Sequence, residues 1–313
     1  PSQINTAGLT HLNFAFASID PKTFKIKLQN QDDEDVYRQF LAIKKGSLQL
    51  WLGIGGWEFS DPGETQTTWS DLAASPDNRK TFISSTSEFL KHYGFQGLDI
   101  DWEWPAASNH GGRPDDTKNQ VTLLKELREA LGTTYGLSCV LPLDGSYLRG
   151  IDISGIASQV DWLNVLTYDL HGAWGAQIRP HTDVKEIDEK LNALWESGVN
   201  PRKFTFGLSY YGRGYTLSDR NCQHVGCSFS APSQQGKCSK QTGILSNTEI
   251  KRIIREKNLR PEMIEDGSGS MQVAWDDQWI GYDSPRTIGK KKELANDRCM
   301  GGTAIWAIDY DSS

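Results

Sequence analysis

Residues 95–105 read FQGLDIDWEWP, and acidic side chains alternate in this stretch with bulky apolar ones. Because successive side chains of a β-strand point to opposite faces, a strand over 95–103 places Asp99, Asp101 and Glu103 together. Burying three carboxylates is costly, so the pattern indicates a functional site; the alternative is a surface strand whose acids lie in solvent. The opposite face, which suits packing against helices, carries Leu98, Ile100, Trp102 and Trp104.

Apolar strand candidates alternate with helix-like segments along most of the 313-residue chain. This alternation is typical of a parallel sheet wrapped by helices and predicts an α/β protein, specifically a (β/α)₈ TIM barrel. In the helix candidate 184–197, apolar residues recur at helical spacing before Gly198. The strand candidates are 11–18, 48–56, 95–103, 135–143, 160–168, 203–211 and 302–309, and the helix candidates are 34–45, 77–92, 115–131, 184–197 and 285–296.

These candidates supply seven barrel strands, one fewer than a closed eight-stranded barrel needs. The absent one is the first, which would precede residue 11. A barrel must close to remove its edges. We therefore expect either that the first strand lies outside this sequence or that the barrel is incomplete.

The interval 214–282 interrupts the alternation. It contains a helix candidate at 246–257 and strand candidates at 271–275 and 278–282. We expect a small α+β insertion subdomain over 214–282, before the last strand. The catalytic barrel would then comprise 1–213 and 283–313.

Composition excludes several classes of protein. The formal net charge is −7 and the pI is about 5.4, whereas nucleic-acid binding needs a basic face. No stretch reaches the roughly 20 apolar residues of a membrane span, and the start of the chain is not a signal peptide. Hydrophobic residues make up 37% of the chain, enough for a sizeable core.

Three of the five cysteines crowd into one Gly/Ser/Gln-rich stretch as Cys222, Cys227 and Cys238. Disulfides are the natural cross-link for such a segment and indicate an oxidising, extracellular location. The alternative is a zinc site with His224, whose spacing fits no known zinc finger. The odd total leaves one thiol over, and Cys139 and Cys299 are both candidates for it.

The order along the acidic strand assigns roles. Glu103 lies nearest the C-terminal end, where barrel enzymes carry their sites, and Asp101 and Asp99 lie deeper. Carboxylates this close cannot all ionise, so protons are shared and pKa values rise. An acid that stays protonated near neutral pH is what glycoside cleavage requires.

The same strand resembles the D-G-x-D-x-D-x-E signature of family 18 glycoside hydrolases, the chitinase family. The match consists of Gly97, Asp99, Asp101 and Glu103. Gln96 stands where the signature has its first Asp, and Trp104 stands where Tyr is usual.

Further segments resemble the family in the family's order and span nearly the whole chain. They are LGIGGW at 52–57, LTYDLHGAW at 166–174, GLSYYGR at 207–213 and AIWAIDYD at 304–311. Family substitutions include Gly53 for Ser and Leu166 for Met. The cysteine-bearing insertion resembles the fungal chitinases akin to killer-toxin α-subunits.

The resemblance implies hydrolysis of chitin or chitooligosaccharides, by endo or exo action, with substrate assistance and retention of configuration. Glu103 would be the general acid and base, and Asp101 would hold the acetamido N–H. Asp99 would share a proton with Asp101, and Tyr168 would donate to the acetamido oxygen unless it is a core tyrosine.

Trp306 would form the floor of the sugar site, although an inward tryptophan could equally be core packing. Trp57, Trp104 and Trp174 follow strand ends and would be stacking platforms, with the same alternative. Further substrate contacts are assigned to Asp169, Tyr210 and Arg213.

The resemblance implies no metal and no cofactor, and we expect a secreted monomer. Two rival readings remain. One is a non-catalytic chitin-binding lectin on the same barrel, which the presence of Glu103 disfavours. The other is a chitin-engaging subunit of a toxin-like protein, which is compatible with catalysis.

Overall fold

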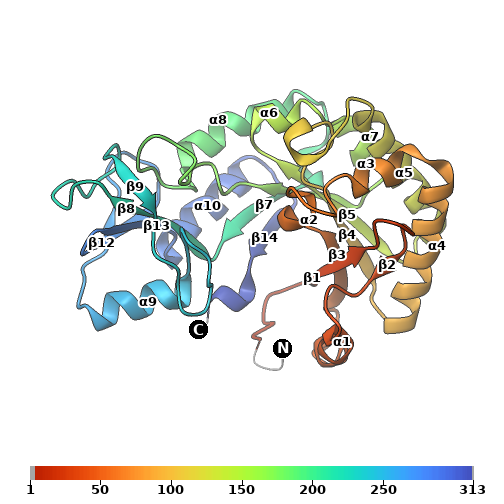
Figure 1. The fold of residues 1–313 in the computed structure, drawn as a ribbon, viewed down its shortest axis with the longest axis horizontal. Helices are drawn as coiled ribbons and strands as arrows, with labels where there is room; N and C mark the ends of the chain where they lie inside the picture. Colours follow the sequence, from red (N-terminus) through yellow and green to blue (C-terminus); the bar gives the residue numbers. More distant parts are fainter. Residues whose placement is uncertain (1–3, 312–313) are drawn as a thin grey trace. The chain divides into compact units, whose positions relative to one another are not determined.

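The computed structural model describes residues 4–311, and the chain divides into two compact units. Unit 1 runs up to Asn164 and includes Ser197–Val199. Unit 2 comprises Val165–Glu196 and the chain from Asn200 onward. Figure 1 shows the elements of both, coloured along the sequence.

The sheet of unit 1 is parallel except at one edge. Strands β1, β3, β4 and β5 pair in that order in parallel, and β2 pairs with β1 in antiparallel orientation. Strand β6 crosses the division between the units. The bounds are β1 (His11–Ile19), β2 (Ile26–Lys27), β3 (Gln49–Gly55), β4 (Gly97–Asp101), β5 (Gly136–Pro142) and β6 (Trp162–Leu166).

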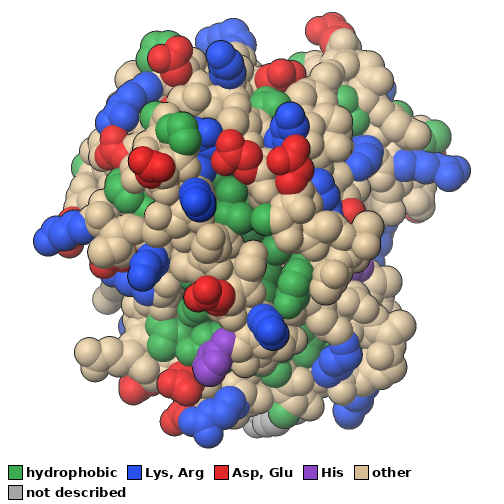
Figure 2. All heavy atoms as spheres, turned by 90° about the vertical axis from the view of Figure 1, so that its right-hand side faces the viewer, with side chains coloured by type: hydrophobic (Ala, Val, Ile, Leu, Met, Phe, Trp, Pro, Cys, Tyr) green, Lys and Arg blue, Asp and Glu red, His purple; other side chains and the backbone are tan. Residues whose placement is uncertain are grey.

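Helices α3, α4 and α5 pack on one another beside this sheet (Figure 1). Helix α4 begins where the Ser75 side chain accepts from the Asn78 N–H, and it ends at Gly94, whose φ is 89°. Figure 2 shows basic and acidic side chains interspersed on the face that carries α4 and α5. The helices are α1 (Asp33–Leu41), α2 (Trp57–Ser60), α3 (Thr68–Ala74), α4 (Pro76–Tyr93), η1 (Ser108–His110), α5 (Asp116–Leu131), α6 (Gly145–Leu148) and α7 (Ile153–Ala157).

An aromatic layer closes the end of the unit 1 sheet where its strands begin. Trp51 of β3 stacks on Trp162 with 4.5 Å between ring centroids. A Cβ at Gly97 or Gly136 would lie 2.3 Å or 1.9 Å from the Trp51 ring. Both positions are therefore glycine because the ring lies directly against the backbone.

Unit 2 contains a pair of parallel strands and a separate antiparallel sheet. Strand β7 pairs with β14 in parallel. The second sheet has the order β10-β8-β13-β12-β11, and β9 pairs with β8. The strands are β7 (Phe204–Ser209), β8 (Tyr211–Leu217), β9 (Phe229–Pro232), β10 (Ile244–Ser246), β11 (Glu262–Met263), β12 (Met271–Trp275), β13 (Gln278–Tyr282) and β14 (Gly302–Trp306).

Helix α9 covers one face of the second sheet (Figure 1). It begins at a capping box, in which Ser246 accepts from the Glu249 N–H and the Glu249 carboxylate accepts from the Ser246 N–H. Its Ile250 lies in one core with Val273 and Ile280 of the sheet. The helices of unit 2 are α8 (Val184–Trp195), η2 (Pro201–Lys203), α9 (Asn247–Glu256), α10 (Pro285–Asp297) and η3 (Ile308–Tyr310).

The strands that end near the expected site are shorter than the sequence predicts. The candidate 95–103 forms a strand only to Asp101, because the neighbouring strand β3 ends at Gly55. Gly55 has a φ of 106°, and a Cβ there would lie 2.1 Å from the Asp101 carbonyl oxygen. Without a partner on that side, the backbone of Glu103 leaves the sheet. The candidates 160–168, 203–211 and 302–309 likewise end early, at Leu166, Ser209 and Trp306.

Each of the seven expected barrel strands forms a strand in the structure. Within the described part of the chain, residues 4–10 form no strand before His11. The antiparallel sheet begins at Tyr211 and ends at Tyr282, close to the expected insertion at 214–282. The division into a barrel and an insertion subdomain stays a prediction.

Candidate active site

The alternation of β4 separates its acids from its apolar residues. Leu98 and Ile100 are buried on one face, and Trp102, just past the strand, stacks on Trp69 of α3 at 5.7 Å. The opposite face carries Asp99 and Asp101, and Glu103 continues the column by a hydrogen bond with Asp101. All three acids are buried, with 7%, 7% and 8% of their surface exposed.

Asp99 lies at the bottom of the column among polar groups of neighbouring strands. Its Oδ1 accepts from the Ser138 hydroxyl at 2.5 Å and from Asn164 Nδ2 at 3.0 Å. Burial raises the pKa of Asp99, although hydrogen bonds with Ser138, Asn164 and Asn13 oppose the rise. The strands therefore provide Asp99 with a dedicated set of donors.

Asp101 lies between two other acids. Burial first, and then the charge of Asp99, raise the pKa of Asp101 to about 8, while the hydrogen bond with Glu103 opposes the rise. Asp101 is therefore harder to ionise than a free carboxyl group. Its Oδ1 is buried with no hydrogen-bond partner within residues 4–311, although buried acceptors are normally paired.

The position before the column carries the departure from the expected signature. Gln96 stands where an Asp is usual, and its Oε1 accepts from the Leu50 N–H of β3 at 2.9 Å. Gln96 is thus part of the strand pairing, remote from Glu103.

Two of the three tryptophans predicted as stacking platforms are exposed. Trp57 is 47% exposed and Trp174 is 63% exposed. Trp104 is only 4% exposed and packs against Tyr147, with centroids 6.0 Å apart. Since stacking on a sugar needs an accessible face, the burial of Trp104 favours its core-packing alternative.

In unit 2, Asp169 is the centre of a network of charged and polar groups. Arg213 donates two hydrogen bonds of 2.6 Å to its carboxylate, from Nε to Oδ1 and from Nη2 to Oδ2. The Tyr211 hydroxyl donates to Oδ1 at 2.5 Å, and His181 Nδ1 lies 3.2 Å from the same oxygen. Burial alone would raise the pKa of Asp169, but the charge and hydrogen bonds of Arg213, with those of His181, hold it below its ordinary value.

Arg213 also orients an exposed ring. Its Cζ lies 4.7 Å from the centroid of Trp174, within the range of a cation–π contact. Unit 2 therefore brings together Asp169, Arg213 and Trp174, three of the predicted substrate-binding residues.

The remaining predicted residues of unit 2 lie at strand ends. Tyr168 follows β6, and its ring covers Gly207 of β7, where a Cβ would lie 2.8 Å from Tyr168 Cε1. Trp306 ends β14, and its carbonyl oxygen accepts from the Tyr210 N–H at 2.8 Å. All three aromatic residues are half-buried.

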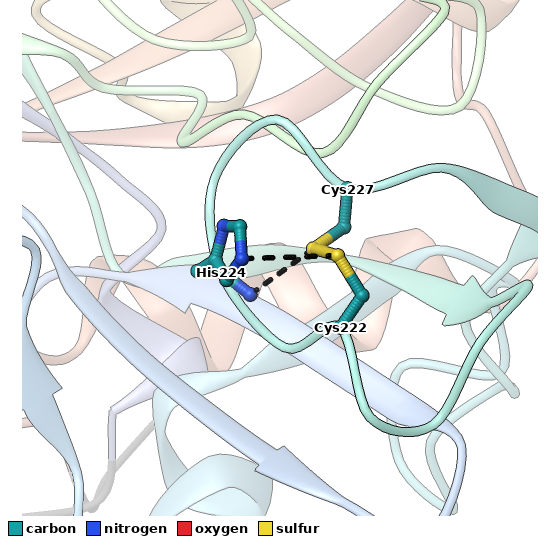
Figure 3. A group of neighbouring side chains, drawn as sticks. All are labelled: Cys222, His224 and Cys227. Carbon is teal, nitrogen blue, oxygen red and sulfur yellow. Dashed lines mark hydrogen bonds between the residues drawn. A yellow bond between two sulfur atoms is a disulfide. The ribbon is translucent and has the colours of Figure 1, made fainter.

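The cysteine cluster forms one disulfide. Cys222 bonds to Cys227, whereas Cys139, Cys238 and Cys299 are free thiols. His224 Nε2 lies 3.8 Å from Cys222 Sγ (Figure 3). Because the disulfide uses both sulfur atoms, they cannot serve as thiolate ligands, and the zinc alternative loses two of its three donors.

Several polar residues of these networks were not singled out from the sequence. They are Asn13, Ser138, Asn164, His181 and Tyr211. The first three share one signal, a polar side chain flanked by apolar residues within a strand candidate. His181 follows a loop with no regular spacing, so only the fold brings it to Asp169.

Comparison with known proteins gives several related chitinases. "Secreted chitinase LysM12" of Penicillium expansum is 28% identical over 99% of this chain and 22% of its own length. "Killer toxin subunits alpha/beta" of Kluyveromyces lactis is also 28% identical, over 99% of this chain and 27% of its own. The chain thus spans about a quarter of the length of these relatives.

Solved structures are similar over almost the whole chain. The Group II chitinase catalytic domain 2 of Ostrinia furnacalis is 26% identical and has a TM-score of 0.91, covering 99% of this chain and 85% of that domain. A mutant of that domain was solved in complex with a penta-N-acetyl chitooligosaccharide, (NAG)5. These similarities confirm the α/β barrel fold class.

No helix within residues 4–311 is both long and apolar enough to cross a membrane. The model of the family described as "Glycosyl hydrolases family 18" matches residues 1–311. The resemblance seen in the sequence motifs is therefore confirmed over nearly the full length, and this chain belongs to family 18 of the glycosyl hydrolases.

Proposed function

We propose that this chain is a chitinase that hydrolyses β-1,4-linked N-acetylglucosamine polymers, by endo or exo action, with retention of configuration. The observation that carries the proposal is the buried column on β4. Its middle member, Asp101, has a raised pKa and, among residues 4–311, no hydrogen-bond partner for its buried Oδ1. An incoming amide N–H would complete that oxygen's hydrogen bonding.

The arrangement of the acids favours substrate assistance. Retaining enzymes that use a carboxylate nucleophile place two carboxyl groups roughly 5–5.5 Å apart on either side of the scissile bond. Here Asp99, Asp101 and Glu103 are stacked along one strand and its continuation. One acid, Glu103, is enough if the 2-acetamido carbonyl of the substrate is the nucleophile.

The first step breaks the glycosidic bond. Glu103 gives its proton to the leaving oxygen while the acetamido oxygen bonds to the anomeric carbon, forming a cyclic oxazolinium-like cation. In the second step the Glu103 carboxylate takes a proton from water, whose oxygen bonds to the same carbon. The ring reopens, and two inversions at one carbon give net retention.

The neighbouring groups support that cation. Asp101 would accept from the acetamido N–H, and its proton would pass toward Asp99 as positive charge develops. Burial raises the pKa of Asp99 and so suits it to receive this proton, although hydrogen bonds with Ser138, Asn164 and Asn13 oppose the rise. Tyr168 would donate its hydroxyl to the acetamido oxygen.

The substrate class rests on exposed aromatic rings and on the relatives. Trp57 and Trp174 offer accessible faces for stacking on sugars, and Trp306 would form the floor of the cleavage subsite. Asp169, Tyr210 and Arg213 would contact sugar hydroxyl groups. The complex of the related Ostrinia domain with (NAG)5 supports an N-acetylglucosamine oligomer as ligand.

We further propose that the protein acts outside the cell as a monomer. The Cys222–Cys227 disulfide fits an oxidising compartment, and the Penicillium relative is described as secreted.

The test is hydrolysis of a fluorogenic chitobioside by the parent protein, Glu103→Gln and the control Glu88→Gln. Glu88 is exposed on α4, so its variant should match the parent. Glu103→Gln should lower kcat/KM by about 100- to 10,000-fold, the usual contribution of a general acid. Proton NMR of the first product should show the β-anomer.

Two results would overturn the proposal. A parent protein that binds chitotetraose without cleaving it would identify a lectin instead. Equal activity of the Glu103→Gln and Glu88→Gln variants would show that another group supplies the proton.

A further inference from the structure

His181 is a fully buried histidine in the segment that leads from β6 to α8. Its Nε2 lies 3.2 Å from the Tyr211 carbonyl oxygen. Its Nδ1 lies 3.3 Å from the Asp169 backbone nitrogen and 3.2 Å from Asp169 Oδ1. One imidazole ring therefore contacts both the backbone and the side chain of Asp169.

Nδ1 can make only one of these two hydrogen bonds at a time, because one needs its lone pair and the other needs a proton on it. The Tyr211 carbonyl only accepts, so Nε2 must carry a proton. The Asp169 N–H only donates and therefore needs a lone pair on Nδ1, whereas the ionised carboxylate only accepts and needs a proton there. Neutral His181 thus binds the Asp169 amide, and doubly protonated His181 binds the Asp169 carboxylate.

The amide contact matters because the backbone of Asp169 is in the left-handed region. Its φ is 60°, a conformation that is disfavoured for residues other than glycine. The His181 ring accepts from the Asp169 N–H, and the His181 carbonyl oxygen accepts from the Leu170 N–H at 3.1 Å. His181 therefore accepts hydrogen bonds from the N–H groups of two consecutive residues at this turn.

The two oxygens of the Asp169 carboxylate accept different numbers of hydrogen bonds. Oδ1 accepts from Arg213 Nε and the Tyr211 hydroxyl and faces His181. Among the described residues, Oδ2 accepts only from Arg213 Nη2. The Asp169 side chain is 34% exposed, and a carboxylate oxygen with one donor can accept from a further hydroxyl group.

We propose that His181 is a positioning residue for Asp169, whose turn it holds through Nδ1 so that the carboxylate can accept from a substrate hydroxyl. The inference rests on the proposed function, in which Asp169 contacts the substrate.

Among the described residues, the ionisable groups Asp169 and Tyr211 contact this ring directly, and Arg213 acts through Asp169. The rings of Tyr168 and Tyr310 lie against Tyr211, with centroids 6.2 Å and 6.1 Å away.

The first test is independent of activity. Nitrogen-15 NMR of the histidine side chains, with His181 assigned by its loss in His181→Asn, reports which ring nitrogen carries a proton. We expect Nε2 to carry a proton and Nδ1 to carry none. A proton on Nδ1 would overturn the proposal.

The second test separates positioning from packing. His181→Asn keeps an acceptor for the Asp169 N–H, whereas His181→Phe keeps the ring shape without polar atoms. Thr182→Val is the matched control: it removes the adjacent buried contact between Thr182 and Ser270, 3.2 Å long, and leaves Asp169 untouched.

With chitotetraose as substrate, His181→Phe should raise KM about tenfold, the value of one hydrogen bond, and change kcat less. His181→Asn should restore KM. Equal effects of His181→Phe and Thr182→Val would reduce His181 to a packing residue. If the parent binds without turnover, the dissociation constant measured by calorimetry replaces KM, so failure of the proposed function leaves this test decisive.

Discussion

Asp101 and Glu103 share a hydrogen bond, and the other carboxyl oxygen of Asp101 is buried with no partner within residues 4–311. A buried acceptor without a donor costs free energy in the unliganded protein. A ligand that brings an N–H to that oxygen would recover this free energy on binding. The relationship therefore links the stability of the protein to its proposed chemistry.

The first prediction concerns the pH dependence of stability. The pKa of Asp101 rises from 3.8 to about 8 on folding, so between these values the folded chain holds a proton that the unfolded chain releases. The free energy of unfolding then falls as pH rises, by at most about 1.4 kcal/mol per pH unit for one proton. Asp101→Asn should reduce this slope in urea unfolding between pH 4.5 and 8.

The control is Asp20, whose contribution to the free energy of unfolding changes with pH in the opposite direction. Hydrogen bonds from the Thr23 and Lys22 N–H groups lower the pKa of Asp20, so Asp20 stabilises the fold above its ordinary pKa and this effect is lost as pH falls. Asp20→Asn should leave the decline toward pH 8 intact. Parallel pH curves for the parent and Asp101→Asn would contradict the assignment of the proton to Asp101.

The second prediction concerns the donors around Asp99. Ser138→Ala removes the 2.5 Å hydrogen bond to Oδ1, leaves a buried acceptor less well satisfied, and raises the pKa of Asp99 further. We expect a loss of about 1–3 kcal/mol in unfolding free energy and a displaced pH profile of kcat. Ser154→Ala, which removes an exposed hydrogen bond to the Ser197 carbonyl, should have little effect on either; equal losses would refute the prediction.

The third prediction separates sugar-binding tryptophans from core tryptophans. Because Trp57 and Trp174 are exposed, replacing either with Ala should change stability by less than about 0.5 kcal/mol. Affinity for chitotetraose should fall by about two- to tenfold, the range of one aromatic contact. Trp104→Ala, which empties a buried site, should instead cost about 3–5 kcal/mol of stability. Calorimetry and thermal unfolding measure both quantities, and unchanged affinity in both exposed variants would exclude them as platforms.

The fourth prediction concerns the disulfide. Cys222 and Cys227 are five residues apart, and closing so short a loop is worth about 2 kcal/mol through the unfolded state. Cys222→Ser should destabilise the core that contains Tyr215 and Trp279, against which Cys222 packs. Cys238→Ser removes an exposed free thiol and should be neutral. Unfolding followed by tryptophan fluorescence distinguishes them, and the effect of Cys222→Ser should vanish when both proteins are reduced.

Helices were the most accurately predicted part of the fold. The candidates 115–131 and 285–296 became α5 at Asp116–Leu131 and α10 at Pro285–Asp297. Their limits are set locally, by caps such as Ser284, whose side chain accepts from the Thr287 N–H. Local signals of this kind are readable without knowing what a helix packs against.

Strand ends were less well predicted because they depend on the neighbouring strand. Nothing in residues 95–103 shows that pairing stops at Asp101; that limit follows from the turn of β3 at Gly55. The same dependence applies to Trp104: like Trp57 it follows a strand candidate, but the fold buries it and places Tyr147 against its ring.

The sequence by itself determined the carboxylate column, because alternation along one strand is a local property. It also determined the family, since the motifs occur in order along the chain. The tertiary structure alone decided which polar groups serve that column and the Asp169 cluster. Ser138, Asn164 and His181 lie 39, 65 and 12 positions from their acids, and contacts across such distances form only when strands pair and loops pack.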